Sequence, residues 1–306
     1  MSVTRPTDGE YVCHGVTWAT GDPRLLLAPL PDGPLVYAEI MNQRLGFSVG
    51  ADRWCTGRYR FADTVRVEAL ACPDRAPAGQ GDQCARCFRQ DEFRFAHQFH
   101  QDGNVPKALR QYMDQPHWLY LATFADGASK VGTAAEPRKQ SRLDEQGALI
   151  ATYMTKSSDG RAVRHLEDAI TRGLQMPQTV RAATKLKALA TLTDLTAATM
   201  THDHHVARAA GALTAMDISV MLEKWNPPAE GGRMRVAKGI RMLYPHDLRE
   251  DEHGFTVVSC VGTQVLAALD GDDDLDYVLD LGTLKGRRIT LGPFSSPTTA
   301  VQSSLF

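Results

Sequence analysis

The sequence predicts an α+β protein, and three features of its 306 residues support this fold class. Runs rich in β-branched and aromatic residues stand near both ends of the chain. A long segment between them is rich in Ala, Leu, Lys and Met, which favour helix. Four cysteines lie together before that segment. We therefore expect an α/β core with a zinc-binding module and flanking β subdomains.

The composition is that of an ordinary globular protein, with 43% hydrophobic and 23% charged residues. The formal net charge of -2 gives no overall attraction to nucleic acid or anionic lipid. The first residues have no basic start and no apolar run, and no stretch approaches the ~20 apolar residues that span a bilayer. We therefore predict a cytoplasmic protein with no membrane partner, in which clustered cysteines favour a metal over disulfides.

The chain divides into four predicted regions. They are an N-terminal β region (1–52), a zinc-binding module (53–110), an α/β core with added helices (111–225) and a C-terminal β subdomain (233–306). In the first region, the run Leu35–Ile40 follows a Pro- and Gly-rich turn. The core begins with a strong strand at His117–Phe124 and a short one around Lys130–Gly132, and continues mainly as helix.

A Pro- and Gly-rich linker, Trp225–Gly232, separates the core from the last region. After it, four short runs separated by Asp and Gly turns predict strands. These runs are Phe255–Gly262, Thr263–Asp270, Leu275–Gly282 and Arg287–Gly292.

Cys84 and Cys87 form a C-x2-C pair, whose spacing lets one tight turn direct two thiolates at a single tetrahedral ion. Cys55 and Cys72 complete a four-sulfur shell. A shell with no open position indicates a structural rather than a catalytic zinc ion. Three alternatives remain open: His97 or His100 in place of one sulfur, a redox C-x-x-C, or four unrelated buried cysteines.

The segment from His117 to Ala169 resembles a divergent GIY-YIG domain, a small nuclease fold. The triplet Trp118-Leu119-Tyr120 stands where that family has its first motif, and Lys130-Val131-Gly132 where it has its second. Arg142, in the run SRLDEQGA, stands at the family's arginine, and Glu167, in VRHLEDAI, at its glutamate. The resemblance implies a metal-dependent nuclease-like hydrolase in which Glu167 holds Mg²⁺ or Mn²⁺.

A second resemblance covers most of the chain. The upstream cysteines, the KVG triplet, the RLDEQGA run and the later glutamate together are similar to a prokaryotic cysteine-cluster family of unassigned function. This resemblance implies no activity.

The residues named in the GIY-YIG resemblance also suit phosphate chemistry when they are considered independently of that family. A Tyr phenol such as that of Tyr120 can position or deprotonate water, and the Arg142 guanidinium can bind two phosphate oxygens. A Glu167 carboxylate can hold a divalent ion. Arg138 is a second candidate for the arginine, and with Lys139 it is a candidate phosphate-binding residue. Each of these residue types, taken alone, has a structural role more often than a chemical one.

Lys130 replaces the second tyrosine of the nuclease pattern. With an ordinary pKa near ~10.4, a lysine is protonated at pH 7 and cannot act as a base. It can still bind a phosphate. This substitution favours phosphate binding over phosphodiester cleavage.

Between positions 130 and 190 there are 11 basic and 6 acidic residues, a local charge of +5. Such a segment suits contact with a phosphate backbone, or forms solvated helix faces with i,i+4 pairs. His202 and His205 would share a helix face as metal ligands, but a polar helix surface explains them more simply.

Three functions from different classes follow. The first is a zinc-containing protein that acts on nucleic acid through the residues Tyr120, Lys130, Arg142 and Glu167. The second is a non-catalytic DNA- or RNA-binding module. The third is an enzyme on a small molecule of specialised metabolism that reuses the same cleft. A small closed pocket would favour the third function, and an open basic groove the first two.

Overall fold

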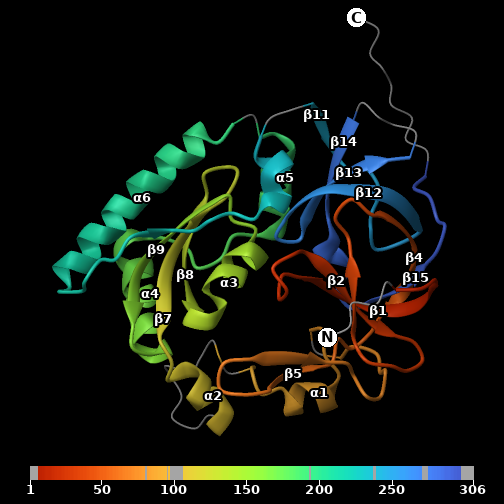
Figure 1. Ribbon diagram of the computed structural model, residues 1–306, viewed down its shortest axis with the longest axis horizontal. Helices are drawn as coiled ribbons and strands as arrows, with labels where there is room; N and C mark the ends of the chain where they lie inside the picture. Colours follow the sequence, from red (N-terminus) through yellow and green to blue (C-terminus); the bar gives the residue numbers. More distant parts are fainter. Residues whose placement is uncertain are drawn as a thin grey trace, which may run out of the picture.

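The computed structural model describes residues 6–79, 81–94, 96, 106–192, 194–236, 239–270 and 275–297. Helices and strands are mixed in these residues, so the predicted α+β class is confirmed. Figure 1 shows a large sheet of red and blue strands beside a smaller yellow-green sheet, with a short hairpin below them. No helix in the described ranges has the length and apolar character needed to cross a bilayer.

The large sheet has nine strands in the order β11-β14-β13-β12-β4-β15-β1-β2-β3. Its N-terminal strands are β1 (Gly9–Thr17), β2 (Arg24–Pro29), β3 (Val36–Glu39) and β4 (Arg44–Arg53). Its C-terminal strands are β11 (Ile240–Leu243), β12 (Glu252–Val261), β13 (Gln264–Leu269), β14 (Leu275–Asp280) and β15 (Arg287–Leu291). Because β15 lies between β4 and β1, strands from the two ends of the chain form one sheet.

One core cluster stabilises this sheet. Its buried side chains include Trp18, Phe47, Phe255, Tyr277 and Ile289, which come from both ends of the chain. The Trp18 indole N–H donates to the carbonyl of Gly262 at 2.9 Å, so its polar atom is also satisfied. The predicted division into separate terminal regions thus describes the sequence order, while the strands of both regions share one hydrophobic core.

The small sheet has four strands in the order β10-β9-β7-β8, with β7 paired to both β8 and β9. They are β7 (His117–Thr123), β8 (Ser129–Ala135), β9 (Ile150–Ser157) and β10 (Glu223–Lys224). The expected strands at His117 and around Lys130 are thus present. The sequence analysis expected mainly helix after them and did not predict β9, although Ile150, Thr152, Tyr153 and Thr155 are typical strand residues.

Helices cover both faces of the small sheet. The helices that follow the cysteine module are α2 (Lys107–Met113), α3 (Lys139–Gln146), α4 (Gly160–Leu174), α5 (Ala182–Ala190), α6 (Thr196–Ala215) and α7 (Gly232–Arg235), with 3-10 turns η1 (Glu136–Arg138), η2 (Ala229–Gly231) and η3 (Leu281–Leu284). Of these, α5, α7, η2 and η3 contact strands of the large sheet. Side chains of α4 and α6 pack on one face with Leu119 and Val131. Leu143 of α3 packs on the other face with Tyr120 and Tyr153.

Residues 225–232, the predicted linker, are packed against the core. The Trp225 side chain is buried, and its backbone N–H donates to the Ala151 carbonyl at 3.1 Å. A hydrophobic cluster that includes Leu149, Leu189 and Val278 then joins the two sheets through α5, which lies between them in Figure 1. The third β unit is the hairpin of β5 (Arg58–Phe61) and β6 (Val67–Leu70), which lies with the short helix α1 (Ala85–Gln90) below the two sheets.

Candidate functional site

The four predicted zinc ligands, Cys55, Cys72, Cys84 and Cys87, converge. Their sulfur atoms all lie within 4.8 Å of one another, and none of them is in a disulfide. The Sγ atoms of Cys72 and Cys84 are 3.9 Å apart. Four sulfurs around a tetrahedral zinc ion at about 2.3 Å would be about 3.8 Å apart. The cluster is therefore compatible with a structural metal ion such as zinc.

Backbone N–H groups point at these sulfurs. The amides of Cys84 and Gly57 donate to Cys55 Sγ at 3.1 and 3.3 Å. Gly57 has a φ of +73°, and a Cβ there would lie 1.8 Å from the Leu70 carbonyl oxygen, so this close approach requires glycine. Burial raises the pKa of Cys55 to about 11, which means that a metal ion must displace its proton. His97 and His100, the alternative ligands, lie outside the described residues.

The cysteine module leads directly into a pocket wall. After Cys87, the Asp91 carboxylate accepts from the Tyr59 amide at 3.0 Å and from the Gln83 side chain at 2.7 Å. These bonds join the end of α1 to β5. Phe93 follows and packs edge-on against Tyr112 of α2, with the ring centroids 5.7 Å apart.

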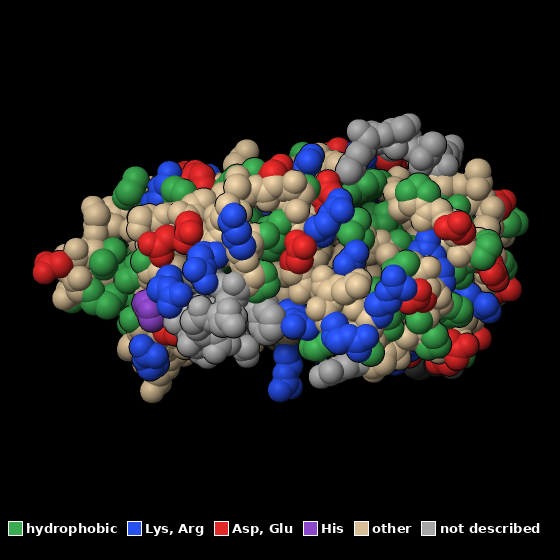
Figure 2. Space-filling view, turned by 90° about the horizontal axis from the view of Figure 1, so that it is seen from below, with side chains coloured by type: hydrophobic (Ala, Val, Ile, Leu, Met, Phe, Trp, Pro, Cys, Tyr) green, Lys and Arg blue, Asp and Glu red, His purple; other side chains and the backbone are tan. Residues whose placement is uncertain are grey.

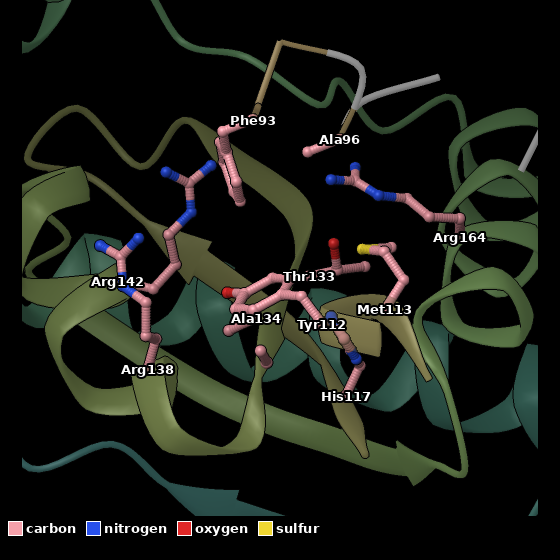
Figure 3. A pocket seen from close by; sticks show the side chains of 11 residues that line it. Phe93, Ala96, Tyr112, Met113, His117, Thr133, Ala134, Arg138, Arg142 and Arg164 are labelled. Carbon is pink, nitrogen blue, oxygen red and sulfur yellow. The ribbon is translucent and has the colours of Figure 1, made fainter. Parts of the chain in front are cut away.

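A pocket of about 80 Å³ lies at the outer edge of β8, between α2, α3 and α4. It is lined by Phe93, Ala96, Tyr112, Met113, His117, Thr133, Ala134, Ala135, Arg138, Arg142 and Arg164. Figure 3 shows Arg142 and Arg164 on opposite sides of the pocket, with Thr133 between them. Its size suits a few water molecules or one small oxyanion.

Local structure places these arginines. Arg138 ends the turn η1, and Arg142 lies one turn further on in α3, which ends at Gly147 in a left-handed conformation. Arg164 lies in the first turns of α4, which begins where the Asp159 carboxylate caps the backbone amides of residues 161 and 162.

Two of the three guanidinium groups are paired with carboxylates. Arg138 is 2.6 Å from Glu145, and Arg164 is 2.6 Å from Glu167. Arg142 has no carboxylate within ion-pair distance among the residues that the structure describes. The three arginines and two carboxylates leave one positive charge at the pocket. The Arg164 Nε is also buried without a hydrogen-bond partner.

The edge of β8 adds polar groups to this pocket. The Val131 amide donates to the Pro177 carbonyl at 3.2 Å, on the side of β8 away from β7. Because backbone groups alternate in direction along an antiparallel strand, the Thr133 amide also points away from β7. Thr133 lines the pocket, so its amide and hydroxyl lie beside the guanidinium groups.

Tyr120, on strand β7 next to β8, is completely buried, and its hydroxyl has no hydrogen-bond partner among the described residues. It lies opposite Gly132 in the β7–β8 ladder, and a Cβ at Gly132 would stand 2.5 Å from its phenol oxygen. The third residue of the KVG triplet must therefore be glycine. Desolvation raises the pKa of Tyr120, and the charges of Arg142, Glu167 and Arg164 also act on it.

Lys130 is 5% exposed, and its amine donates to the side-chain oxygen of Gln146. Burial lowers its pKa to about 7, helped by the positive charges of Arg142 and Lys185. The assumption of an ordinary lysine pKa was therefore wrong, because it ignored the cost of burying an ammonium.

The predicted site residues thus divide into two groups. Tyr120, Lys130, Arg142 and Glu167 are close enough to influence one another's charge, although Arg142 alone of the four lines the pocket. Their chemical roles stay predictions. Of the two predicted phosphate-binding residues, Arg138 lines the pocket but Lys139 does not.

Lys139 is engaged elsewhere. Its amine lies 4.5 Å from the Trp118 ring centroid, 5.0 Å from that of Tyr153 and 2.8 Å from the Glu223 carboxylate. These contacts fix the amine on the α3 face of the sheet as a packing and ion-pair residue.

Beyond the four cysteines, the described residues contain no further group of three His, Cys, Asp or Glu side chains that could hold a metal ion. A divalent ion at Glu167 would have to displace Arg164 from that carboxylate. His202 is not a candidate ligand, because its two ring nitrogens lie 2.8 Å from the hydroxyls of Thr123 and Thr152. It connects α6 to the small sheet.

Several pocket residues were missed by the sequence analysis, notably Arg164, Thr133 and Phe93. Arg164 stands three residues before Glu167, and this i,i+3 spacing on a predicted helix was the available signal. Phe93 had none, because its place depends on how the cysteine module folds against α2.

Residues 79–227 match the model of a family described as a protein of unknown function (DUF2797). This range includes Cys84, Cys87 and the four residues of the predicted cleft. The predicted resemblance to a family without assigned function is supported over this range, while a relationship to GIY-YIG nucleases stays a prediction. Neither a curated protein nor a solved structure matches the chain.

Proposed function

We propose that this chain is a zinc-containing protein that binds nucleic acid, with one phosphate group held in the arginine pocket. The observation that carries the proposal is the set of three guanidinium groups around one pocket, of which Arg142 has no carboxylate partner in the described ranges. A guanidinium binds two phosphate oxygens at once, so Arg142 and Arg164 suit a phosphate between them.

The surface around the pocket suits a polymeric ligand with several phosphates better than a single free phosphate ion. Figure 2 shows many Lys and Arg side chains on the lower face of the molecule, where α1 and α2 lie. Arg89 of α1 and Lys107 and Arg110 of α2 are exposed, and no described carboxylate pairs with them. Since α2 also supplies Tyr112 to the pocket, these cations can bind phosphates that flank the one in the pocket.

The charge of the core segment is partly neutralised, which limits this surface. Arg138, Lys139, Lys156 and Arg164, four of the eleven basic residues between 130 and 190, form ion pairs. The binding surface that we propose is therefore the pocket with α1 and α2, and not the whole basic segment.

Binding is better supported than cleavage. Glu167 is buried and pairs with Arg164, and Tyr120 is completely buried and does not line the pocket. A metal-dependent hydrolase would need Mg²⁺ or Mn²⁺ at Glu167, where the ion would neutralise the phosphate charge. We propose that the cysteine cluster binds zinc, because a closed four-thiolate shell is typical of structural zinc, and a cytoplasmic location accords with reduced thiols.

The test is binding of labelled single- and double-stranded DNA and RNA, with and without Mg²⁺ or Mn²⁺. We expect salt-sensitive binding that weakens roughly 10- to 100-fold in Arg142→Ala, as expected for a lost charged hydrogen bond. The control is Lys187→Ala, at an exposed position of α5, which should bind normally. Equal binding by both variants would contradict the proposal. Cleavage that needs the metal and disappears in Glu167→Ala would convert it to a nuclease function.

A second candidate function is supported by one observation. The pocket is small, with room for one oxyanion, which also suits an enzyme on a small phosphorylated substrate. A mononucleotide that binds as tightly as an oligonucleotide, with little salt dependence, would favour this alternative.

A further inference from the structure

The surroundings of Lys130 are unusual for a lysine. Its side chain leaves β8 on the α3 side of the small sheet and is almost completely buried. Its amine donates a hydrogen bond to the uncharged side-chain oxygen of Gln146, at the end of α3. No carboxylate in the described part of the chain lies within ion-pair distance of it.

The groups that face Lys130 come from four elements. Strand β7 supplies the Tyr120 ring, whose centroid is 6.0 Å from the amine. Helix α3 supplies Arg142, α4 supplies Arg164 with Glu167, and α5 supplies Lys185. Lys185 is anchored nearby, since its amine donates to the Gln146 backbone carbonyl at 2.6 Å. Three cations therefore act on the amine, against one carboxylate that Arg164 already binds.

An ammonium in this position is unfavourable for two reasons. Burial removes its hydration, and a neutral amide oxygen replaces only part of it. The three cations then repel it across a medium less polarisable than water. The pKa of Lys130 is accordingly lowered to about 7, and burial of Lys185 lowers the pKa of that lysine to about 8.

A ligand in the pocket would make the protonated form of Lys130 favourable again. Arg142 and Arg164 line it, and both repel Lys130. An anion bound to their guanidinium groups would offset that repulsion and add an attractive charge. This step rests on the proposed function and extends it: we propose that Lys130 is an uncharged amine in the ligand-free protein at mildly alkaline pH, and that it takes up a solvent proton when a phosphate group binds between Arg142 and Arg164.

This coupling fixes the direction of the pH dependence. The bound protein holds one more proton on the Lys130 nitrogen than the free protein does at pH values above the free pKa. Affinity therefore falls as pH rises above about 7, by at most about tenfold per pH unit, until the bound form also loses the proton. Below about pH 7 both forms are protonated and this dependence disappears.

The first experiment measures Lys130 directly in the full-length protein by NMR titration of isotope-labelled lysine side chains. The Lys130 signal is the one that disappears in Lys130→Arg. We expect it to titrate near neutral pH in the free protein, and at higher pH after addition of a short oligothymidylate without terminal phosphates. Titration at the ordinary lysine pKa of about 10.4 in the free protein overturns the proposal.

The second experiment measures proton uptake by calorimetry of the same oligothymidylate in two buffers of different ionisation enthalpy. Its phosphodiesters do not titrate near neutral pH, so a proton taken up belongs to the protein. We expect uptake approaching one proton about one pH unit above the free pKa, none in Lys130→Met, and unchanged uptake in Lys187→Met. Binding by the wild type without uptake overturns this inference alone. Absence of binding by the wild type overturns the proposed function and the phosphate-linked step together, while a neutral-pH titration of free Lys130 would still show the uncharged amine.

Discussion

Gly132 and Tyr120 show how single residues determine the packing of the small sheet. The phenol ring fills the space that a side chain at position 132 would need, and its hydroxyl makes no hydrogen bond among the described residues. The ring is completely buried and packs with Leu143 of α3 and Ala134 of β8, in the close-packed interior typical of proteins.

Gly132→Ala is therefore expected to destabilise the protein by about 1–3 kcal/mol, since the new methyl group overpacks a closed core. The matched control is Gly173→Ala in α4, where no atom lies within 4 Å of the added Cβ and alanine favours the helix. Urea denaturation of both variants measures the difference. If Gly132→Ala were as stable as the wild type, the Tyr120 ring would be free to shift.

Asp144 gives a prediction with a defined pH dependence. Its side chain is buried and accepts from the indole of Trp225 at 3.1 Å and the amide of Gln140 at 2.9 Å. Burial raises its pKa to about 6. The folded state thus binds the proton more tightly than the unfolded state, whose pKa is the ordinary 3.8. The free energy of unfolding therefore falls as pH rises from about 4 to about 6, and stays lower above that.

Asp144→Asn should remove the loss of stability that ionisation of the buried carboxyl group causes, while the side-chain oxygen of Asn keeps both hydrogen bonds. We expect the variant to be more stable than the wild type by about 1–3 kcal/mol at neutral pH, and equally stable below about pH 4. Chemical denaturation across this range measures the gain. Asp203→Asn, at an exposed position of α6, is the control and should show no such pattern. A variant less stable than the wild type at neutral pH would contradict the argument.

At this scale the sequence predicted what depends on residue type and spacing. The C-x2-C pair and its two upstream partners identified the four cysteines that converge. The charge state of Lys130 was not predictable, because it depends on burial and on cations from α3, α4 and α5. The position of Lys139 outside the pocket was unpredictable for a related reason: it is adjacent to Arg138 in sequence, but its side chain packs against Trp118.

Among the elements, the cysteine module and α2 together form one wall of the pocket. The hydrogen bonds of Asp91 and Glu92 to β5 position Phe93, which packs on Phe61 and Tyr112. The short helix α1 begins at a metal-ligand candidate, Cys84, and carries another, Cys87. A metal ion would therefore stabilise the segment that places Phe93.

Cys84→Ser is expected to lower the zinc content from about one ion per chain, and to weaken oligonucleotide binding roughly tenfold through the loss of the Phe93 wall. Elemental analysis and the binding assay measure the two effects. The control, Cys13→Ala, alters a buried cysteine of the large sheet and should retain both properties. Zinc loss with unchanged binding would show that the module and the pocket are independent.

The elements also show where pattern reading fails. The strand at His117–Thr123 was predicted because its apolar and aromatic residues are continuous. The strand β9 was not, since it stands between two helices and its Ala151 and Met154 suit helix as well. Its pairing with β7 at the centre of the small sheet makes this segment a strand, and such pairing is not a property of the local sequence.

For the whole molecule, the pairing of the two chain ends is the main feature that the sequence did not show. Each terminal region has strand patterns of its own, which predicted two β regions. Strand β15, however, pairs with β1 on one side and β4 on the other, and β12 also pairs with β4. Pairing between strands more than 200 residues apart leaves no periodic signal in either segment, because hydrophobic alternation reports a buried face and not its partner.

Ile289 of β15 tests this connection. It is completely buried and lies opposite Tyr11 of β1 and Val49 of β4. Ile289→Ala should cost about 2–5 kcal/mol as a core truncation. Since β15 holds the N-terminal strands to the C-terminal ones, amide hydrogen exchange should accelerate in β1, β4 and β12 together, and much less in β7. Thr290→Ala, at the half-buried neighbouring position, should leave exchange almost unchanged. Faster exchange confined to β15 would mean that the two ends of the chain fold as independent units, and the shared sheet would not be a cooperative one.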